Sequence, residues 1–212
     1  MTEPMAIMCA GFTTNNVALD EFHDWYDLEH IPERLGVQGF INAERWIGSD
    51  DPNIAFATYD LDTVAVLQSP PYRAFTGANQ SPWTRRIESR LGKIGRFVGE
   101  QIFPGRVAGP PNAGGLLFGA MNVAAEAEDE FNEWYNTEHM PRLLGVAGCL
   151  AARRFRAEGG SHRYLSVYHL SSPAVCASRS WQDAVTTPWA ARITPRTSDR
   201  LRIPMRRYLR GA

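Results

Sequence analysis

The sequence contains two copies of one segment, and this internal repeat constrains the fold more than any other feature. Residues 21–46 and 130–155 are identical at 13 of 26 aligned positions, at a constant offset of 109 residues. The similarity continues in ATYDL and SVYHL at the same offset, and in SPWTRRI and TPWAARI at an offset of 106. A unit of roughly 100 residues that occurs only twice indicates a duplicated domain rather than a solenoid.

The duplication divides the chain into two repeats and a connection. The segment PGRVAGPPNAGG lies between the copies, and its Gly and Pro content is typical of a linker. We therefore expect a first repeat over 1–103, a linker over 104–115 and a second repeat over 116–212.

Both repeats have the same order of predicted elements: a strand, a helix, two strands, a broken second helix and a last strand. In the first repeat these are expected at 5–12, 19–35, 39–47, 54–61, 64–90 and 94–103. In the second repeat they are expected at 116–123, 128–144, 148–156, 163–170, 173–193 and 200–209. Pro32 and Pro141 disfavour helix at the preceding residue, so the regular part of each first helix is predicted to end near Ile31 and Met140.

This order, β-α-β-β-α-β, is the ferredoxin-like arrangement and predicts an α+β fold. The first strand is apolar on both faces, with Ile7 and Cys9 on one and Met8 and Ala10 on the other. Such a sheet needs cover on both sides. Helices cover one face, and the sheet of the other repeat covers the second. We expect two ferredoxin-like repeats packed sheet to sheet, so that one chain suffices; a homodimer of such chains stays open.

Composition excludes several classes of function. The chain has 22 Lys and Arg against 23 Asp and Glu, and this balance argues against a nucleic-acid partner. An Arg-rich segment, 192–210, is interpreted as a last strand with a solvated face. Without an apolar run of 18 residues or a signal-peptide pattern, a membrane partner is not expected. The three Cys lack CxxC spacing, which favours a reduced, cytoplasmic protein without a zinc site.

A family resemblance follows from the repeated motif. WYDLEHIPERLGVQGF, its copy WYNTEHMPRLLGVAGC, the strand ends YDLD and YHLS, and SPWTRRI resemble EthD-like proteins of the dimeric α+β barrel superfamily. The resemblance extends over nearly the whole chain, once per repeat, and it implies an intramolecular dimeric α+β barrel. It also implies a range of activities, because the superfamily includes isomerases, polyketide cyclases, cofactor-free monooxygenases and haem enzymes.

A Glu-His pair ends the first helix of each repeat. On a helical wheel, Glu29 and His30 flank the apolar stripe, and Glu138 and His139 repeat this placement. A buried carboxylate needs partners, and histidine is the commonest general acid or base. Two interpretations stay open: the histidines act in a pocket, or the pair only satisfies backbone groups at the helix end.

The pocket interpretation assigns roles to residues of both repeats. In superfamily members that isomerise or cyclise, a pocket His paired with a Tyr commonly handles the proton. The predicted catalytic residues are the acid-base pair His30 and His139, the orienting residues Glu29 and Glu138, and the oxyanion donors Tyr26 and Tyr135. The predicted substrate contacts are Trp25, Trp134, Tyr59, Tyr168, Asp60 and His169. Asp60 and His169 occupy the same aligned position in the two repeats, at the end of the third strand, where we expect the mouth of a pocket.

These assignments predict a small-molecule enzyme that needs neither a metal nor an organic cofactor. Its chemistry would be proton transfer, as in an isomerase, cyclase or lyase, on an oxygenated aromatic or lactone-like substrate. HExxH, GxGxxG, GxSxG and Walker patterns do not occur in the sequence. The alternatives are a haem-linked protein of the same fold and a non-catalytic ligand-binding or accessory protein.

Overall fold

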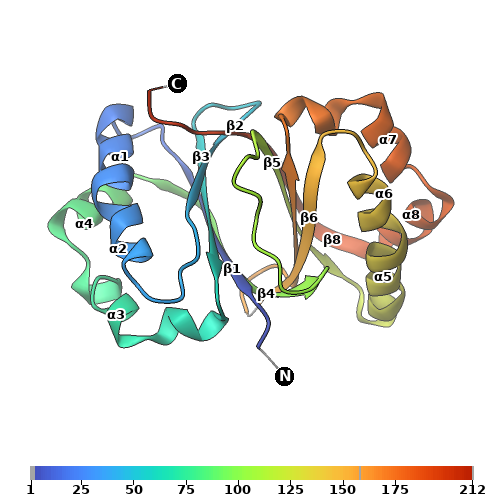
Figure 1. The fold of residues 1–212 in the computed structure, drawn as a ribbon, viewed down its shortest axis with the longest axis horizontal. Helices are drawn as coiled ribbons and strands as arrows, with labels where there is room; N and C mark the ends of the chain where they lie inside the picture. The colour runs from blue at the N-terminus through green and yellow to red at the C-terminus, as the bar shows by residue number, and fades with distance from the viewer. Residues whose placement is uncertain (1–2, 158, 212) are drawn as a thin grey trace.

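A closed barrel of eight antiparallel strands forms the centre of the protein (Figure 1). The computed structural model describes residues 3–157 and 159–211. The strands follow one another around the barrel in the order β1-β3-β2-β8-β5-β7-β6-β4. Their bounds are β1 Ala6–Thr13, β2 Glu44–Gly48, β3 Ile54–Leu61, β4 Gly92–Phe103, β5 Gly115–Val123, β6 Cys149–Ala157, β7 Tyr164–Leu170 and β8 Thr197–Arg207.

The two halves of the sequence contribute the two halves of the barrel. The first supplies neighbouring strands in the order β4-β1-β3-β2, and the second supplies β8-β5-β7-β6, which is the same order. The seams are the pairs β2–β8, with Trp46 opposite Arg207, and β4–β6, with Gly99 opposite Ala157. Closure leaves no sheet edge unpaired. The α+β class and the barrel expected from the sequence are confirmed.

Helices cover the outside of the barrel on two opposite sides, α1–α4 on one and α5–α8 on the other (Figure 1). Within the described residues, no helix is both long enough and apolar enough to cross a membrane. The helix bounds are α1 Leu19–Trp25, α2 Ile31–Leu35, α3 Pro70–Arg73, α4 Pro82–Glu88, α5 Glu128–Trp134, α6 Met140–Leu144, α7 Arg179–Val185 and α8 Pro188–Ile193.

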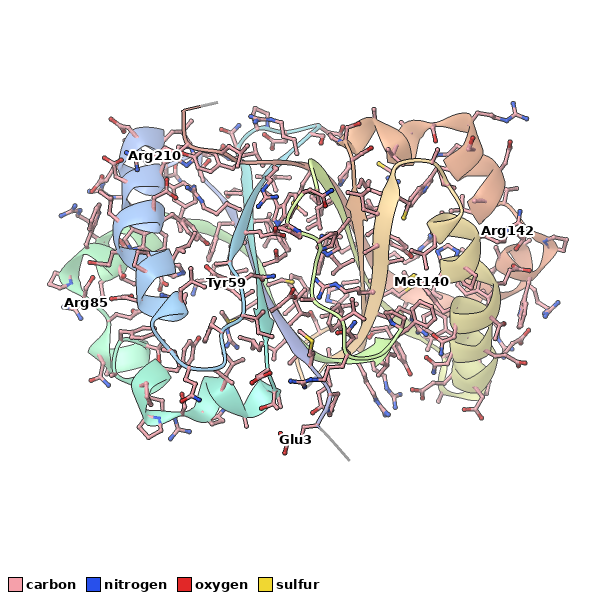
Figure 2. The ribbon with its side chains drawn as sticks, in the orientation of Figure 1. Glu3, Tyr59, Arg85, Met140, Arg142 and Arg210 are labelled. Carbon is pink, nitrogen blue, oxygen red and sulfur yellow. The ribbon has the colours of Figure 1, made fainter. Side chains whose placement is uncertain are left out.

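Three apolar cores result, because strand side chains alternate between the two faces of the sheet. Ile7 and Cys9 point into the barrel, where they pack with residues of the second repeat such as Phe118. Met8 lies on the other face, in the core under α1. A separate core fills the space under α5–α8. Figure 2 shows side chains in both outer layers, with Tyr59 labelled on the first side and Met140 on the second.

Strand β2 is shorter than the predicted 39–47. The chain turns at Gly39, whose φ is +99°, and a Cβ there would lie 2.5 Å from Val66 Cγ2. Phe40 then makes only a single bridge to Leu61 before the strand begins at Glu44. The turn after the helix therefore consumes residues that the apolar pattern had assigned to the strand.

The predicted helix ends at Ile31 and Met140 are wrong. In each repeat a π-helical turn, Tyr26–His30 or Tyr135–His139, follows the first α-helix and continues directly into a second one. The Ile31 N–H bonds the carbonyl of Tyr26, five residues earlier. Pro32 then falls in the first turn of α2, where a missing N–H costs little. The wider turn thus carries the helix past the proline.

Candidate functional site

The π-helical turn of the second repeat holds His139 against a cavity of about 720 Å³. Such turns occur frequently at functional sites. The cavity lies between the helices α5–α8 and the outer face of the barrel, with a contribution at its rim from the β2–β3 turn of the first repeat. Its aromatic and sulfur-bearing lining comprises Trp134, Tyr135, Tyr168, Trp181, Met121 and Cys176.

Aromatic rings surround the imidazole of His139. Its ring centre lies 4.5 Å from that of Trp134, 4.8 Å from that of Tyr135 and 6.3 Å from that of Tyr168. Trp181 continues this wall, 5.4 Å from Tyr168. Among the described residues, neither ring nitrogen of His139 has a hydrogen-bond partner.

Burial keeps this imidazole neutral. It lowers the pKa of His139 to about 3, and the positive charge of Arg154 contributes to the shift. At neutral pH the ring therefore has one nitrogen lone pair free to accept a proton. The neutral imidazole of His139 faces a cavity and bonds nothing in the described part of the chain, so its lone pair is available to accept a proton from a ligand.

Two phenolic hydroxyls lie beside this base. The Tyr168 hydroxyl is buried and has no partner in the described part of the chain. Burial raises its pKa well above the usual value, and the neighbouring Tyr135 adds to the shift. The Tyr135 hydroxyl makes one weak contact, 3.9 Å to the sulfur of Met121. The raised pKa keeps the Tyr168 hydroxyl protonated at neutral pH, and both hydroxyls can donate hydrogen bonds to an oxyanion.

A buried arginine gives this site a positive field. The guanidinium of Arg154 lies 4.2 Å from the ring centre of Tyr135. It donates to Asn136 at 2.6 Å and to Asn132 at 2.9 Å, and no carboxylate pairs with it in residues 3–157 and 159–211. Its counterpart in the first repeat, Arg45, pairs with Asp27 at 2.7 Å. The second repeat thus keeps an uncompensated cation where negative charge on a ligand would be stabilised.

The glutamates of the two pairs contact helix-cap hydroxyls, not the histidines. Glu138 accepts from Thr187 at 2.5 Å and from the indole of Trp134 at 3.2 Å. Thr187 in turn caps α8. In the first repeat Glu29 accepts from Ser81 at 2.6 Å and from Thr84 at 2.8 Å. In both repeats this contact ties the π-helical turn to the start of a following helix.

His30 occupies the same position in the first repeat but is enclosed. Its ring lies 4.3 Å from Trp25 and 4.8 Å from Tyr26, and its Nδ1 is buried without a partner in the described structure. Burial, followed by the charges of Arg34 and Arg45, lowers its pKa well below the usual value. His30 does not line the cavity of His139, which belongs to the other side of the barrel.

Larger side chains fill the space beside His30. Four aligned positions carry a bulky residue in the first repeat and a smaller one in the second: Arg34 for Leu143, Phe40 for Cys149, Leu67 for Cys176 and Phe75 for Ala184. Arg34 is buried, donates to the His30 carbonyl at 3.0 Å and lies 5.4 Å from the ring centre of Phe75. Phe40 stacks on Tyr72 at 5.8 Å. At two positions that line the open cavity, Leu143 and Cys176, the first repeat therefore has larger side chains, whereas at Trp181 it has the smaller Tyr72.

The remaining first-repeat candidates are part of this closed core. Trp25 donates its indole N–H to Thr84 at 3.0 Å. Burial raises the pKa of Tyr26 to about 12, and Tyr59 is buried with an unpartnered hydroxyl among the described residues. Trp134, Tyr135 and Tyr168 line the cavity, whereas these equivalents of the first repeat do not.

Asp60 and His169 lie on the opposite face of the sheet, inside the barrel. Their placement at a pocket mouth is wrong, because strand alternation directs them away from Tyr59 and Tyr168. Asp60 forms a buried ion pair with Arg153 at 2.7 Å, and Arg153 also contacts His169 at 3.0 Å. The linker covers this cluster: the Gly109 N–H donates to Asp60 at 2.7 Å. Asp60 and His169, which differ between the repeats at one aligned position, therefore take part in contacts that join the two halves of the barrel.

Sequence reasoning missed several cavity residues. Trp181 and Cys176 line the cavity but lie in the second half of the second repeat, outside the Glu-His motif. Arg154, which packs on the ring of Tyr135 outside the lining, was missed because its counterpart Arg45 is identical. Comparing side-chain volumes at aligned positions would have indicated which repeat is open.

Comparisons with known proteins identify the architecture. Neither a protein-family model nor a curated protein matches the chain. An anthrone oxidase-like protein matches it with a TM-score of 0.64 at 11% identity, over 97% of this chain and 95% of that one. A candidate monooxygenase from Fusobacterium nucleatum has a TM-score of 0.63 at 8% identity (98% and 94% covered). A chlorite dismutase variant from Candidatus Nitrospira defluvii has a TM-score of 0.60 at 15% identity, over 97% of this chain and 92% of that one. These likenesses show the fold alone.

Proposed function

We propose that the chain is an enzyme of the EthD-like kind, built from two ferredoxin-like repeats, in which His139 removes a proton from an enolisable aromatic substrate. The observation that carries the proposal is the neutral imidazole of His139 in an aromatic cavity beside the hydroxyl of Tyr168, both without a hydrogen-bond partner in the described part of the chain. One site per chain is proposed, because the equivalent space beside His30 is filled.

The proposed step is the deprotonation of a carbon that is conjugated with a ring carbonyl, either next to it or across the ring from it. His139 accepts the proton, and the electron pair of the broken C–H bond forms the enolate, whose charge rests mainly on oxygen. The hydroxyls of Tyr168 and Tyr135 donate to that oxygen. The new negative charge stabilises the imidazolium, so the pKa of His139 rises when the substrate ionises. Return of the proton to another carbon completes an isomerisation.

Arg154 supports the same step from beneath the cavity. Its guanidinium packs on the ring of Tyr135, and the asparagines that orient it do not neutralise its charge. A cation held there favours the enolate over the neutral ketone. Glu138 is proposed as a positioning residue, because its bond to Thr187 fixes the turn that carries His139.

The fold neighbours support an aromatic substrate. One is described as anthrone oxidase-like and another as a candidate monooxygenase. Anthrone has an acidic methylene group opposite its carbonyl, and its three fused rings suit a cavity lined by aromatic side chains. Proton removal is the part of such chemistry that the residues of this cavity can perform themselves.

Haem does not fit the donor set of this cavity. A histidine that ligates a metal almost always donates its second ring N–H to a carboxylate, carbonyl or water. His139 has no such protein acceptor among the described residues, since the nearest candidate in sequence, Glu138, is bonded to Thr187 and Trp134. No mechanistic step is therefore assigned to haem.

Hydrogen–deuterium exchange at the methylene group of anthrone tests the proposal. Proton NMR in D₂O measures loss of the methylene signal with the wild-type chain, His139→Asn and His30→Asn. General-base catalysis contributes about 100-fold or more, so His139→Asn should lose at least that factor. His30→Asn, the same change in the closed repeat, should retain the wild-type rate, with thermal unfolding to confirm that both variants fold.

The outcomes separate an enzyme from a binding protein. Exchange that depends on His139 alone supports the proposal. Binding of anthrone without exchange above the buffer rate would overturn it in favour of a non-catalytic ligand-binding protein. Equal losses in the two variants would show that the open cavity is not the site.

A further inference from the structure

Two arginines at the rim of the His139 cavity have no partner among the residues that the structure describes. Arg200 and Arg202 line the cavity from β8 and are exposed. Neither side chain forms an ion pair or a hydrogen bond within residues 3–157 and 159–211. A β-bulge interrupts the β5–β8 pairing between Ala120 and Asn122, next to Arg200, and both arginines line the cavity beside it. Two free guanidinium groups therefore border one opening.

The closed repeat lacks this pair. The aligned residues of β4 are Ile94 and Arg96. The Arg96 guanidinium contacts the sulfur of Met8 at 3.3 Å, so this arginine packs onto the closed core. A pair of unpartnered arginines thus occurs together with the open cavity.

The surroundings of the rim define the charge of its ligand. Asp50, from the β2–β3 turn of the first repeat, is the acidic residue of the cavity lining and pairs with neither arginine in the described structure. Below the rim the wall is aromatic, with Trp134 and Trp181, and the buried charge of Arg154 lies under Tyr135. The cavity is therefore apolar in its body and positive at its rim.

We propose that the ligand of this cavity is an aromatic compound with a carboxylate group, which Arg200 and Arg202 bind at the rim. The planar guanidinium matches a carboxylate in geometry and forms charge-assisted hydrogen bonds with it. The aromatic body lies along Trp134 and Trp181, within reach of His139. This assignment rests on the proposed function, because it takes the same cavity as the site. It also gives a role to part of the Arg-rich segment 192–210.

A set of matched ligands tests the carboxylate. Calorimetry at pH 7.5 measures binding of 6-hydroxy-2-naphthoate, 2-naphthol and 2-naphthyl phosphate to the wild-type chain. The variants are the double substitution Arg200→Gln with Arg202→Gln, and the control Arg206→Gln. Arg206 lies on the same face of β8 but outside this cavity.

The wild-type chain and Arg206→Gln should bind the naphthoate at least tenfold more tightly than 2-naphthol. The double variant should lose that preference to within twofold while its affinity for 2-naphthol stays unchanged. A preference that is absent, or that survives in the double variant, would overturn the assignment. Tenfold tighter binding of the phosphate than of the naphthoate would overturn it in favour of a phosphate ligand.

The same assay separates this inference from the proposed function. His139→Asn should keep the tenfold preference for the naphthoate, because its imidazole is not part of the rim. A chain that prefers the naphthoate but does not exchange anthrone would disprove the proton-transfer function and leave the carboxylate site standing. Anthrone exchange without a preference for the naphthoate would disprove the carboxylate site and leave the proton-transfer function standing.

Discussion

Replacement of His139 should remove a large part of the acid sensitivity of this fold. The pKa of His139 is lowered from 6.5 to about 3 in the folded chain. The unfolded chain then binds a proton below pH 6.5 that the folded chain does not bind until about pH 3. Stability is therefore complete above pH 6.5 and is lost as the pH falls through that window. The loss at pH 5 is about 2 kcal/mol, from 1.4 kcal/mol per pH unit.

Urea unfolding at pH 8 and at pH 5 measures this effect. Other buried histidines, such as His30 and His169, contribute to the pH dependence of both proteins, so the comparison is between wild type and His139→Asn. The wild-type chain should lose about 2 kcal/mol more than the variant between the two pH values. Equal losses would refute the reasoning, because they would mean that His139 ionises normally in the folded chain.

Further predictions follow from single contacts. Tyr168→Phe removes a buried hydroxyl that lacks a protein partner in the described structure, so urea unfolding should show unchanged or higher stability while anthrone exchange falls at least tenfold; lower stability would contradict this. Arg153→Met leaves Asp60 buried without its counter-ion and should cost about 3–5 kcal/mol in the same assay, whereas a loss below 1 kcal/mol would contradict the buried pair. Thr187→Ala removes the cap of α8 and should lower stability by about 1 kcal/mol. Titration with haem should give no Soret band that depends on His139; a band lost in His139→Asn would contradict the donor-set argument.

The barrel was predictable because duplication and alternation act over the whole chain. Two copies of the same order of strands and helices limit the number of possible topologies. A first strand that is apolar on both faces needs other elements packed against both. The end of the first helix was not predictable in this way. The effect of Pro32 depends on whether the preceding turn is α or π, and residue patterns alone do not distinguish the two.

The site was predictable in its residue types but not in its asymmetry. The motif indicated His139 beside Tyr135 and His30 beside Tyr26, and both pairs are neighbours in the structure, but it did not indicate that only the first of these pairs lines the cavity. The difference includes the volume of residues distant in sequence from the motif, such as Leu67 against Cys176. The sheet face of Asp60 also required the structure, because alternation gives two sets of residues without saying which set meets the cavity.

The number of ligand molecules bound per chain tests the central claim most directly. Calorimetric titration with 2-naphthol should give one molecule per chain, in the cavity of His139. Leu143→Arg introduces the residue that helps to fill the closed repeat, and it should abolish binding. Leu144→Arg places the same side chain at an exposed neighbouring position and should leave binding unchanged. Two molecules per chain, or full binding in Leu143→Arg, would contradict the account.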